Sequence, residues 1–226
     1  MSSALSTLTS VITVVLVIFA AILHEIAHGW VAYKLGDPTA KQAGRLTLNP
    51  AAPLHPFGSV ILPLFMAIAG GPVFAFAKPV PYNPANLHHP RRDEVLVALA
   101  GPACNLIQAA VGAAIFNAVY DASALVLSIS GYTAVFWVLK VLYIYIYVNL
   151  VLAFFNLIPL PPLDGSSIIS PFLSGKARVK YYQIQRYSMP VLLVALYVLP
   201  LIGGFDPLGI YLDATAGNML NLMMGI

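Results

Sequence analysis

The first apolar run of the chain, from about Thr9 to Leu35, carries the motif His-Glu-Ile-Ala-His at residues 24–28. In an α-helix, residues four apart project from the same face about one turn apart. The side chains of His24 and His28 therefore suit two ligands of one tetrahedral zinc ion, and Glu25 would lie beside a zinc-bound water as a candidate general base. Because the run fits a membrane span, it must hold ionisable side chains within a bilayer.

The composition extends the membrane interpretation to the whole chain. Of its 226 residues, 60% are hydrophobic and only 8% are charged, whereas a soluble domain carries about 25% charged residues. We therefore predict an all-α polytopic membrane protein with about five to six transmembrane helices and no large soluble domain. The net charge is only +3, and we expect the basic residues in loops, where they set topology and bind no nucleic acid. The single cysteine, Cys104, excludes an internal disulfide and a cysteine-based zinc site.

Further apolar runs predict the remaining spans of one domain, residues 1–226, with a core at about 9–170 and C-terminal helices at about 180–226. The first span ends at a sharp helix stop, Gly-Asp-Pro at 36–38. We expect no cleaved signal peptide, because cleavage would remove the histidine motif. The later spans are predicted at Val95–Val119, Thr133–Leu157, about Met189–Ile202 and, marginally, Leu208–Ile226.

Two segments between the first and second long spans are predicted to be irregular. Residues 44–50 alternate polar and apolar side chains, which indicates a short strand of a membrane-associated β-hairpin. The apolar run from Phe57 to Ala77 is broken by Pro63 and by Gly-Gly-Pro at 70–72, which favours a re-entrant segment over a straight span.

The distribution of basic residues predicts the orientation of the chain in the cell membrane. The loops 34–45, 78–92 and 176–186 are basic, and the loops near Asp121 and Asp206 are not. Placing the basic loops in the cytoplasm gives a consistent path through the bilayer only if residues 57–77 do not cross fully. The histidine motif then lies toward the cytoplasmic side.

A catalytic zinc site needs a third protein ligand. The candidates are His55, His88, His89 or an acidic residue outside the first helix. Asp164 lies just past the cytoplasmic end of Thr133–Leu157, at a depth similar to that of the histidine motif, and an acid in apolar surroundings is a functional-site candidate. The alternative is that Asp164 only caps a helix that starts at Gly165.

The motif at residues 24–29 and the stretch Asn-Leu-Ile-Pro-Leu-Pro-Pro-Leu-Asp-Gly at 156–165 together resemble the site-2 protease family of intramembrane zinc metalloproteases. Residues 44–50, 56–58 and 99–105 resemble its compact bacterial branch, which lacks a PDZ or cystathionine-synthase-like domain. The resemblance covers roughly residues 10–170.

This resemblance implies that His24, His28 and Asp164 bind one Zn²⁺ and that Glu25 is the general base. It also implies that Asn156 binds substrate or stabilises the oxyanion. The predicted hairpin would offer an edge to a substrate strand. The sequence departs from the family pattern before Pro-Phe-Gly at 56–58: Pro53 and His55 stand where a histidine and then an aspartate would be expected.

The expected function is therefore zinc-dependent cleavage of peptide bonds within or near transmembrane helices, with single-span or small membrane proteins as substrates in the lipid bilayer. A zinc-binding scaffold without catalysis would tolerate loss of Glu25, and a transporter would spread ionisable residues over several spans. For Asn156 the alternative is a hydrogen bond between helices. Asn105, in the Gly-Pro-Ala-Cys-Asn stretch, is expected to be structural. The sequence indicates no oligomeric state.

Overall fold

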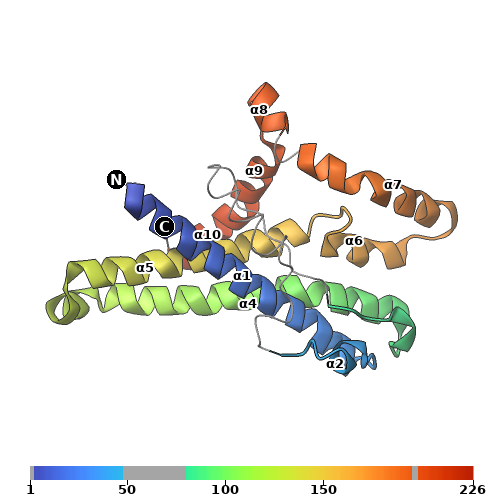
Figure 1. The fold of residues 1–226 in the computed structure, drawn as a ribbon, viewed down its shortest axis with the longest axis horizontal. Coiled ribbons are helices and arrows are strands. Elements are labelled where there is room, and N and C mark those ends of the chain that lie inside the picture. The colour runs from blue at the N-terminus through green and yellow to red at the C-terminus, as the bar shows by residue number, and fades with distance from the viewer. Residues whose placement is uncertain (1–2, 48–79, 195–197, 226) are drawn as a thin grey trace.

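The computed structural model describes residues 3–47, 80–194 and 198–225, and all the regular secondary structure in them is helical (Figure 1). This confirms the all-α prediction. In chain order, the long helices and the first short ones are α1 (Ser3–Lys34), α2 (Thr39–Gln42), the 3-10 turn η2 (Pro84–Asn86), α4 (Pro90–Asp121) and α5 (Ser123–Asn156). The shorter elements that follow are α6 (Asp164–Ile169), η3 (Ser170–Phe172), α7 (Gly175–Leu193), α8 (Leu199–Gly203), α9 (Pro207–Leu212), the π-helical η5 (Asp213–Gly217) and α10 (Asn218–Met224).

Three of these helices are long and apolar enough to cross a membrane: α1 over Leu5–Lys34, α4, and the part of α5 from Gly131 to Asn156. The backbone of α5 breaks at Gly131, where φ is +75°. The three spans match those predicted from Thr9, Val95 and Thr133. The runs predicted as spans near the C-terminus fall on α7–α8 and on α9–η5–α10, and the total of five to six spans stays a prediction.

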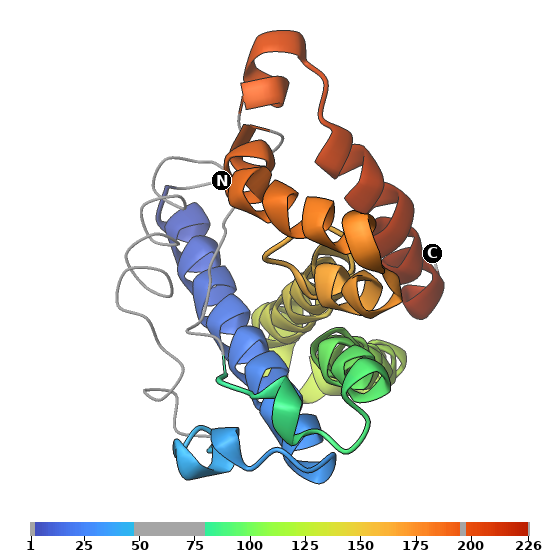
Figure 2. The same cartoon turned by 90° about the vertical axis from the view of Figure 1, so that its right-hand side faces the viewer.

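The helices α4 and α5 lie side by side, and α1 crosses them on one side of the pair (Figures 1 and 2). Small side chains let the helices approach closely, as is usual inside membranes. A Cβ atom on Gly112 of α4 would lie 3.0 Å from Ile146 Cγ1 of α5. The C-terminal helix α10 packs on the same two helices. The buried cluster formed there comprises Ala109, Ala113, Ile146, Leu150, Ala216 and Leu220.

The outer surface of the long helices is apolar. On α1 and α4, large exposed hydrophobic side chains recur every four residues, as a lipid-facing stripe requires. These side chains are Val11, Val15 and Phe19 on α1, and Ile107, Val111 and Ile115 on α4. This surface belongs in a bilayer, and the chain is a membrane protein.

The expectation that all basic residues lie in loops is wrong. Lys176, Arg178, Lys180 and Arg186 lie in the helix α7, and Lys34, Arg91 and Arg92 lie at the ends of α1 and α4. Lys140 lies within α5, where its Nζ donates a hydrogen bond to Thr9 Oγ1 of α1 at 2.8 Å. The same ammonium group lies 5.0 Å from the ring centroid of Trp137. The expectation was wrong at this position because a hydroxyl and an aromatic face together can hold a lysine inside a span.

The predicted strand at residues 44–50 is not confirmed: residues 44–47 carry no strand, and residues 48–50 lie outside the described part. The re-entrant segment predicted at Phe57–Ala77 also lies outside it. The helix stop is confirmed, because α1 ends at Lys34 and Gly36 adopts a φ of +110°.

A buried carboxylate fixes the chain at this end of α1. Asp37 accepts hydrogen bonds from Thr39 N at 3.1 Å, Asn83 N at 2.7 Å and Asn86 Nδ2 at 2.8 Å. Burial raises the pKa of this carboxyl group, but the hydrogen bonds outweigh burial and lower the pKa below its usual value. The contacts hold the segment that begins at Val80 against the end of α1.

We expect Asp37→Ala to lower the free energy of unfolding by about 1–3 kcal/mol, because the amides of Asn83 and Asn86 lose their acceptor. Since the folded pKa is depressed, the contribution of Asp37 is complete above its unfolded pKa of about 3.9 and is lost as the pH falls toward the folded value. Thermal unfolding in detergent at neutral and acidic pH measures both effects. Asp121→Ala, at the exposed end of α4, is the control, and equal stability of the two variants would contradict the assignment.

Candidate metal centre

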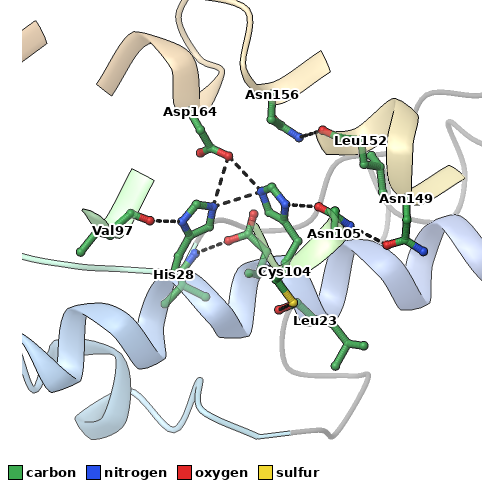
Figure 3. Close-up of polar contacts among 12 residues, drawn as sticks. Leu23, His28, Val97, Cys104, Asn105, Asn149, Leu152, Asn156 and Asp164 are labelled. Atoms are coloured by element: carbon green, nitrogen blue, oxygen red, sulfur yellow. Dashed lines mark hydrogen bonds and ion pairs between the residues drawn. The ribbon is translucent and has the colours of Figure 1, made fainter. Parts of the chain in front are cut away.

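The two histidines of α1 face α4, which runs antiparallel to it at this point. His24 Nδ1 lies 2.5 Å from Asn105 Oδ1, and His28 Nδ1 lies 2.6 Å from the carbonyl oxygen of Val97 (Figure 3). Positions 97 and 105 are two turns apart on one face of α4, and positions 28 and 24 are one turn apart on α1. The α4 helix therefore supplies an acceptor for each imidazole.

Asp164 approaches the same point from the opposite side. The helix α5 ends at Asn156, and a proline-rich turn leads to α6, which begins with Asp164. At Gly165 a Cβ atom would collide with the carbonyl oxygens of Leu157 and Ile158, so only glycine lets α6 start this close to the end of α5. The N-cap position of α6 is Leu163, so Asp164 is already the first helical residue, and its carboxylate faces the two imidazoles (Figure 3). The helix-cap alternative is therefore not what the structure shows.

Three ligand atoms converge between these elements. Asp164 Oδ2 lies 3.0 Å from His24 Nε2 and 3.3 Å from His28 Nε2, and the two Nε2 atoms are 3.0 Å apart. Ligands of a tetrahedral zinc ion with bonds of 2.0–2.1 Å lie about 3.3 Å from one another. Within the described residues this is the one group of three ligand side chains that could hold a metal ion.

The protonation of this group also fits a cation. Because the Val97 carbonyl can only accept, the Nδ1 atom of His28 must carry a proton, and a neutral imidazole then has a lone pair at Nε2. Burial raises the pKa of the Asp164 carboxyl, and protonated His24 and His28 beside it would outweigh burial and hold that pKa at about 2. A bound metal cation would supply the same positive charge to neutral imidazoles and the carboxylate. In the described part of the chain no hydrogen-bond donor is assigned to the buried Oδ2 of Asp164. A metal ion would satisfy the oxygen and both nitrogens together.

Glu25 lies next to His24 in α1, and its carboxylate is oriented by the backbone. The Oε2 atom accepts a hydrogen bond from Val80 N at 2.9 Å. A Cβ atom on Gly29 would lie 2.8 Å from the side chains of Val80 and Leu46, so the glycine allows the Val80 segment to approach α1. The second carboxylate oxygen remains as a site for a proton. The backbone amide of Val80 was not foreseen, because a main-chain donor has no signature in the sequence.

The other predicted candidates lie apart from the three converging atoms. Asn156 Nδ2 donates to Leu152 O within its own helix at 2.9 Å, and no contact joins it to the metal ligands. The side chains of His88 and His89 are exposed and outside the ligand group. His55 lies outside the described residues.

Gly101 was also not foreseen as part of the site. It lies on α4 midway between positions 97 and 105, and a Cβ atom there would overlap the ring nitrogens of both His24 and His28. Only a residue without a side chain lets the imidazoles reach their acceptors on α4. The spacing of 97, 101 and 105 by four residues is the signal that would have placed Gly101 on this face.

Two imidazoles and a carboxylate form the ligand set of a hydrolytic zinc centre. A glutamate next to one of the histidines adds the base that such a centre uses. The family model named "Peptidase family M50" matches residues 12–199. The chain therefore belongs to peptidase family M50. The site and the family together identify the chain as a zinc protease that is a membrane protein.

Named relatives agree with this membership. The putative zinc metalloprotease YwhC of Bacillus subtilis is 40% identical over 215 residues, which cover 94% of this chain and 91% of the relative. The putative zinc metalloprotease Rip2 of Mycobacterium tuberculosis H37Rv is 30% identical over 183 residues, which cover 81% of this chain and 65% of the relative. Rip2 of Mycolicibacterium smegmatis is 29% identical over 174 residues, covering 77% and 62%. No solved structure matches the chain significantly.

We expect Gly101→Ala to lower zinc affinity by at least about tenfold, because the new methyl group occupies the space of the imidazole nitrogens. Competition with a chelator measures the affinity in the purified protein. Gly217→Ala is the matched control, since a Cβ atom there would lie 3.9 Å from its nearest neighbour, Leu212 O. Unchanged zinc affinity in Gly101→Ala would contradict the described packing.

Proposed function

We propose that the protein is an intramembrane endopeptidase that hydrolyses peptide bonds within or near the transmembrane helices of single-span or small membrane proteins. The observation that carries this proposal is the position of the metal centre along α1. With a rise of 1.5 Å per residue, His28 and His24 lie about 9 and 15 Å from the helix end at Lys34. These depths fall inside a hydrocarbon core about 30 Å thick.

The chain's own residues support hydrolysis at this point. Bound zinc would acidify a water molecule and polarise the scissile carbonyl group. Glu25 takes the proton of the attacking water and returns it to the leaving amine, and the Val80 amide keeps its carboxylate in place for both steps. His24, His28 and Asp164 hold the metal.

We assign Asn156 to substrate binding. Its Nδ2 atom has two N–H groups, and one is used by the carbonyl of Leu152. The other can donate to a substrate carbonyl as negative charge develops on its oxygen. The residue ends α5, directly before the turn that delivers Asp164, which favours a role beside the ligands over a contact between helices.

The substrate must be locally unwound before attack, because helical peptide bonds are shielded by their own hydrogen bonds. Substrates with Gly, Pro or Asn near the cleavage point are therefore favoured. The segment at residues 44–50 remains our candidate edge for an extended substrate strand, although residues 44–47 form no strand by themselves.

The metal centre is proposed to face the cytoplasmic side of the cell membrane, which the chain crosses several times. The end of the bundle nearest to the centre carries Lys34 at the end of α1 and Arg91 and Arg92 at the start of α4. The opposite end of α4 carries Asp121. This asymmetry follows the positive-inside rule.

We expect Glu25→Gln to bind zinc like the wild type and to cleave a model single-span substrate about 10²–10⁴ times more slowly, because the base is lost and the ligands remain. Asp164→Ala should lose zinc affinity by at least about a hundredfold and lose cleavage with it. Zinc content and substrate cleavage in proteoliposomes are measured on the same preparations. His89→Ala, outside the ligand group, is the control.

Two outcomes of this experiment contradict the proposal. Continued cleavage by Glu25→Gln would exclude Glu25 as the base. Zinc binding by the wild type without cleavage of any membrane-spanning substrate would favour a zinc-binding scaffold instead.

For Asn156→Ala we expect unchanged zinc affinity and about 10²–10³-fold slower cleavage, the usual cost of one lost oxyanion donor. The matched control is Asn117→Ala, which removes an asparagine hydrogen bond to Met223 O remote from the ligands. Equal cleavage by the two variants would assign Asn156 to helix packing alone.

A further inference from the structure

Two buried asparagines of the helix bundle are not explained by the proposed mechanism. Asn105 on α4 and Asn149 on α5 both have fully buried side chains, with 0% exposure. A buried amide in an apolar bundle is costly unless its donors and acceptor are used. Asn105 was expected to be merely structural, and Asn149 lies in an otherwise apolar run of α5.

The two amides form one chain of hydrogen bonds that ends on a metal ligand. Asn149 Nδ2 donates to the Tyr145 carbonyl at 2.9 Å, and Asn149 Oδ1 accepts from Asn105 Nδ2 at 2.8 Å. Asn105 Oδ1 then faces His24 Nδ1 at 2.5 Å (Figure 3).

The direction of this chain is fixed at its far end. A backbone carbonyl can only accept, so the Tyr145 carbonyl requires the NH₂ group of Asn149 to face it. The oxygen of Asn149 must then face Asn105 and can only accept from it. The oxygen of Asn105 is in turn left for His24, which must donate from Nδ1.

We infer that Asn105 and Asn149 are positioning residues that hold His24 with its proton on Nδ1 and its Nε2 lone pair aimed at the metal. This inference rests on the proposed function of His24 as a zinc ligand. Asn105 acts on His24 directly, and Asn149 acts by orienting the Asn105 amide.

A comparison with His28 shows why the side-chain acceptor of His24 needs a second residue to orient it. His28 gives its Nδ1 proton to the Val97 carbonyl, an acceptor that belongs to the backbone and cannot be reversed. An amide side chain can flip its oxygen and nitrogen, and a flipped Asn105 would present an N–H group to His24. The second amide, Asn149, removes this freedom without adding a charge to the apolar bundle.

The test measures zinc affinity of the full chain in detergent by chelator competition, in the Glu25→Gln background, so that the result is independent of cleavage. We expect Asn105→Leu to weaken zinc binding about 10–100-fold, as the loss of a hydrogen-bond partner behind a metal-ligating histidine does. Asn105→Asp keeps an acceptor for His24 and should restore affinity to within about threefold of the parent. Asn149→Leu should give an intermediate loss.

Gln108→Leu is the matched control. Gln108 is buried one turn further along α4, and its Oε1 accepts from Tyr145 Oη of α5 at 2.9 Å, but it has no contact with an imidazole. Its replacement removes a buried polar contact between the same two helices, and zinc affinity should be unchanged. With Co²⁺ in place of zinc, the visible spectrum should shift in Asn105→Leu and not in Gln108→Leu.

The inference is overturned if Asn105→Leu binds zinc like the parent, if Asn105→Asp binds no better than Asn105→Leu, or if Gln108→Leu loses as much. Should Asn105→Leu fail to fold, full zinc affinity in Asn149→Leu overturns it as well. Failure of the proposed function has a different signature, namely a parent protein that binds no zinc or a wild type that binds zinc and cleaves nothing.

Discussion

A histidine that binds a metal through Nε2 keeps a proton on Nδ1, and where the ring packs between helices a protein acceptor must take that hydrogen bond. This constraint determines how α1 meets α4. The acceptors at Val97 and Asn105 must be two turns apart, opposite His28 and His24. The residue between them, Gly101, must lack a side chain because both rings pass over it. Helix packing and metal chemistry thus make the same demands on one face of α4.

Two other polar groups of the described residues show how a charge is held away from the metal centre. Lys140 is held by a hydroxyl and an aromatic ring, and Asp37 is held by amides just beyond the end of α1. Helices of the described part are also joined by individual hydrogen bonds, from Tyr145 Oη to Gln108 Oε1, from Asn117 Nδ2 to Met223 O and from Tyr211 Oη to Phe154 O. Among the described residues, the chain of hydrogen bonds from the Tyr145 carbonyl through Asn149 and Asn105 to His24 links the most buried amides, and it ends on a metal ligand.

The sequence was sufficient for features that depend on local chemistry or on charge. The spacing of His24 and His28, the helix stop at Gly36, and the convergence of Asp164 with the histidines were all predictable. Asn149 was not, because an amide in an apolar run has the same pattern whether it packs or orients a neighbour. Residues 44–47, the described part of the strand expected at 44–50, form no strand. Alternating polar and apolar residues over so short a stretch give a strand only where a partner strand pairs with them.

The third ligand belongs to α6, far along the chain from the other two. Because a chain is synthesised from its N-terminus, the histidines of α1 are made before the acceptors on α4 and before Asp164. The insertion of α4 supplies the acceptors for Nδ1, and only the arrival of Asp164 completes the set of ligands. The complete set of metal ligands therefore exists only once α6 has packed against α1 and α4.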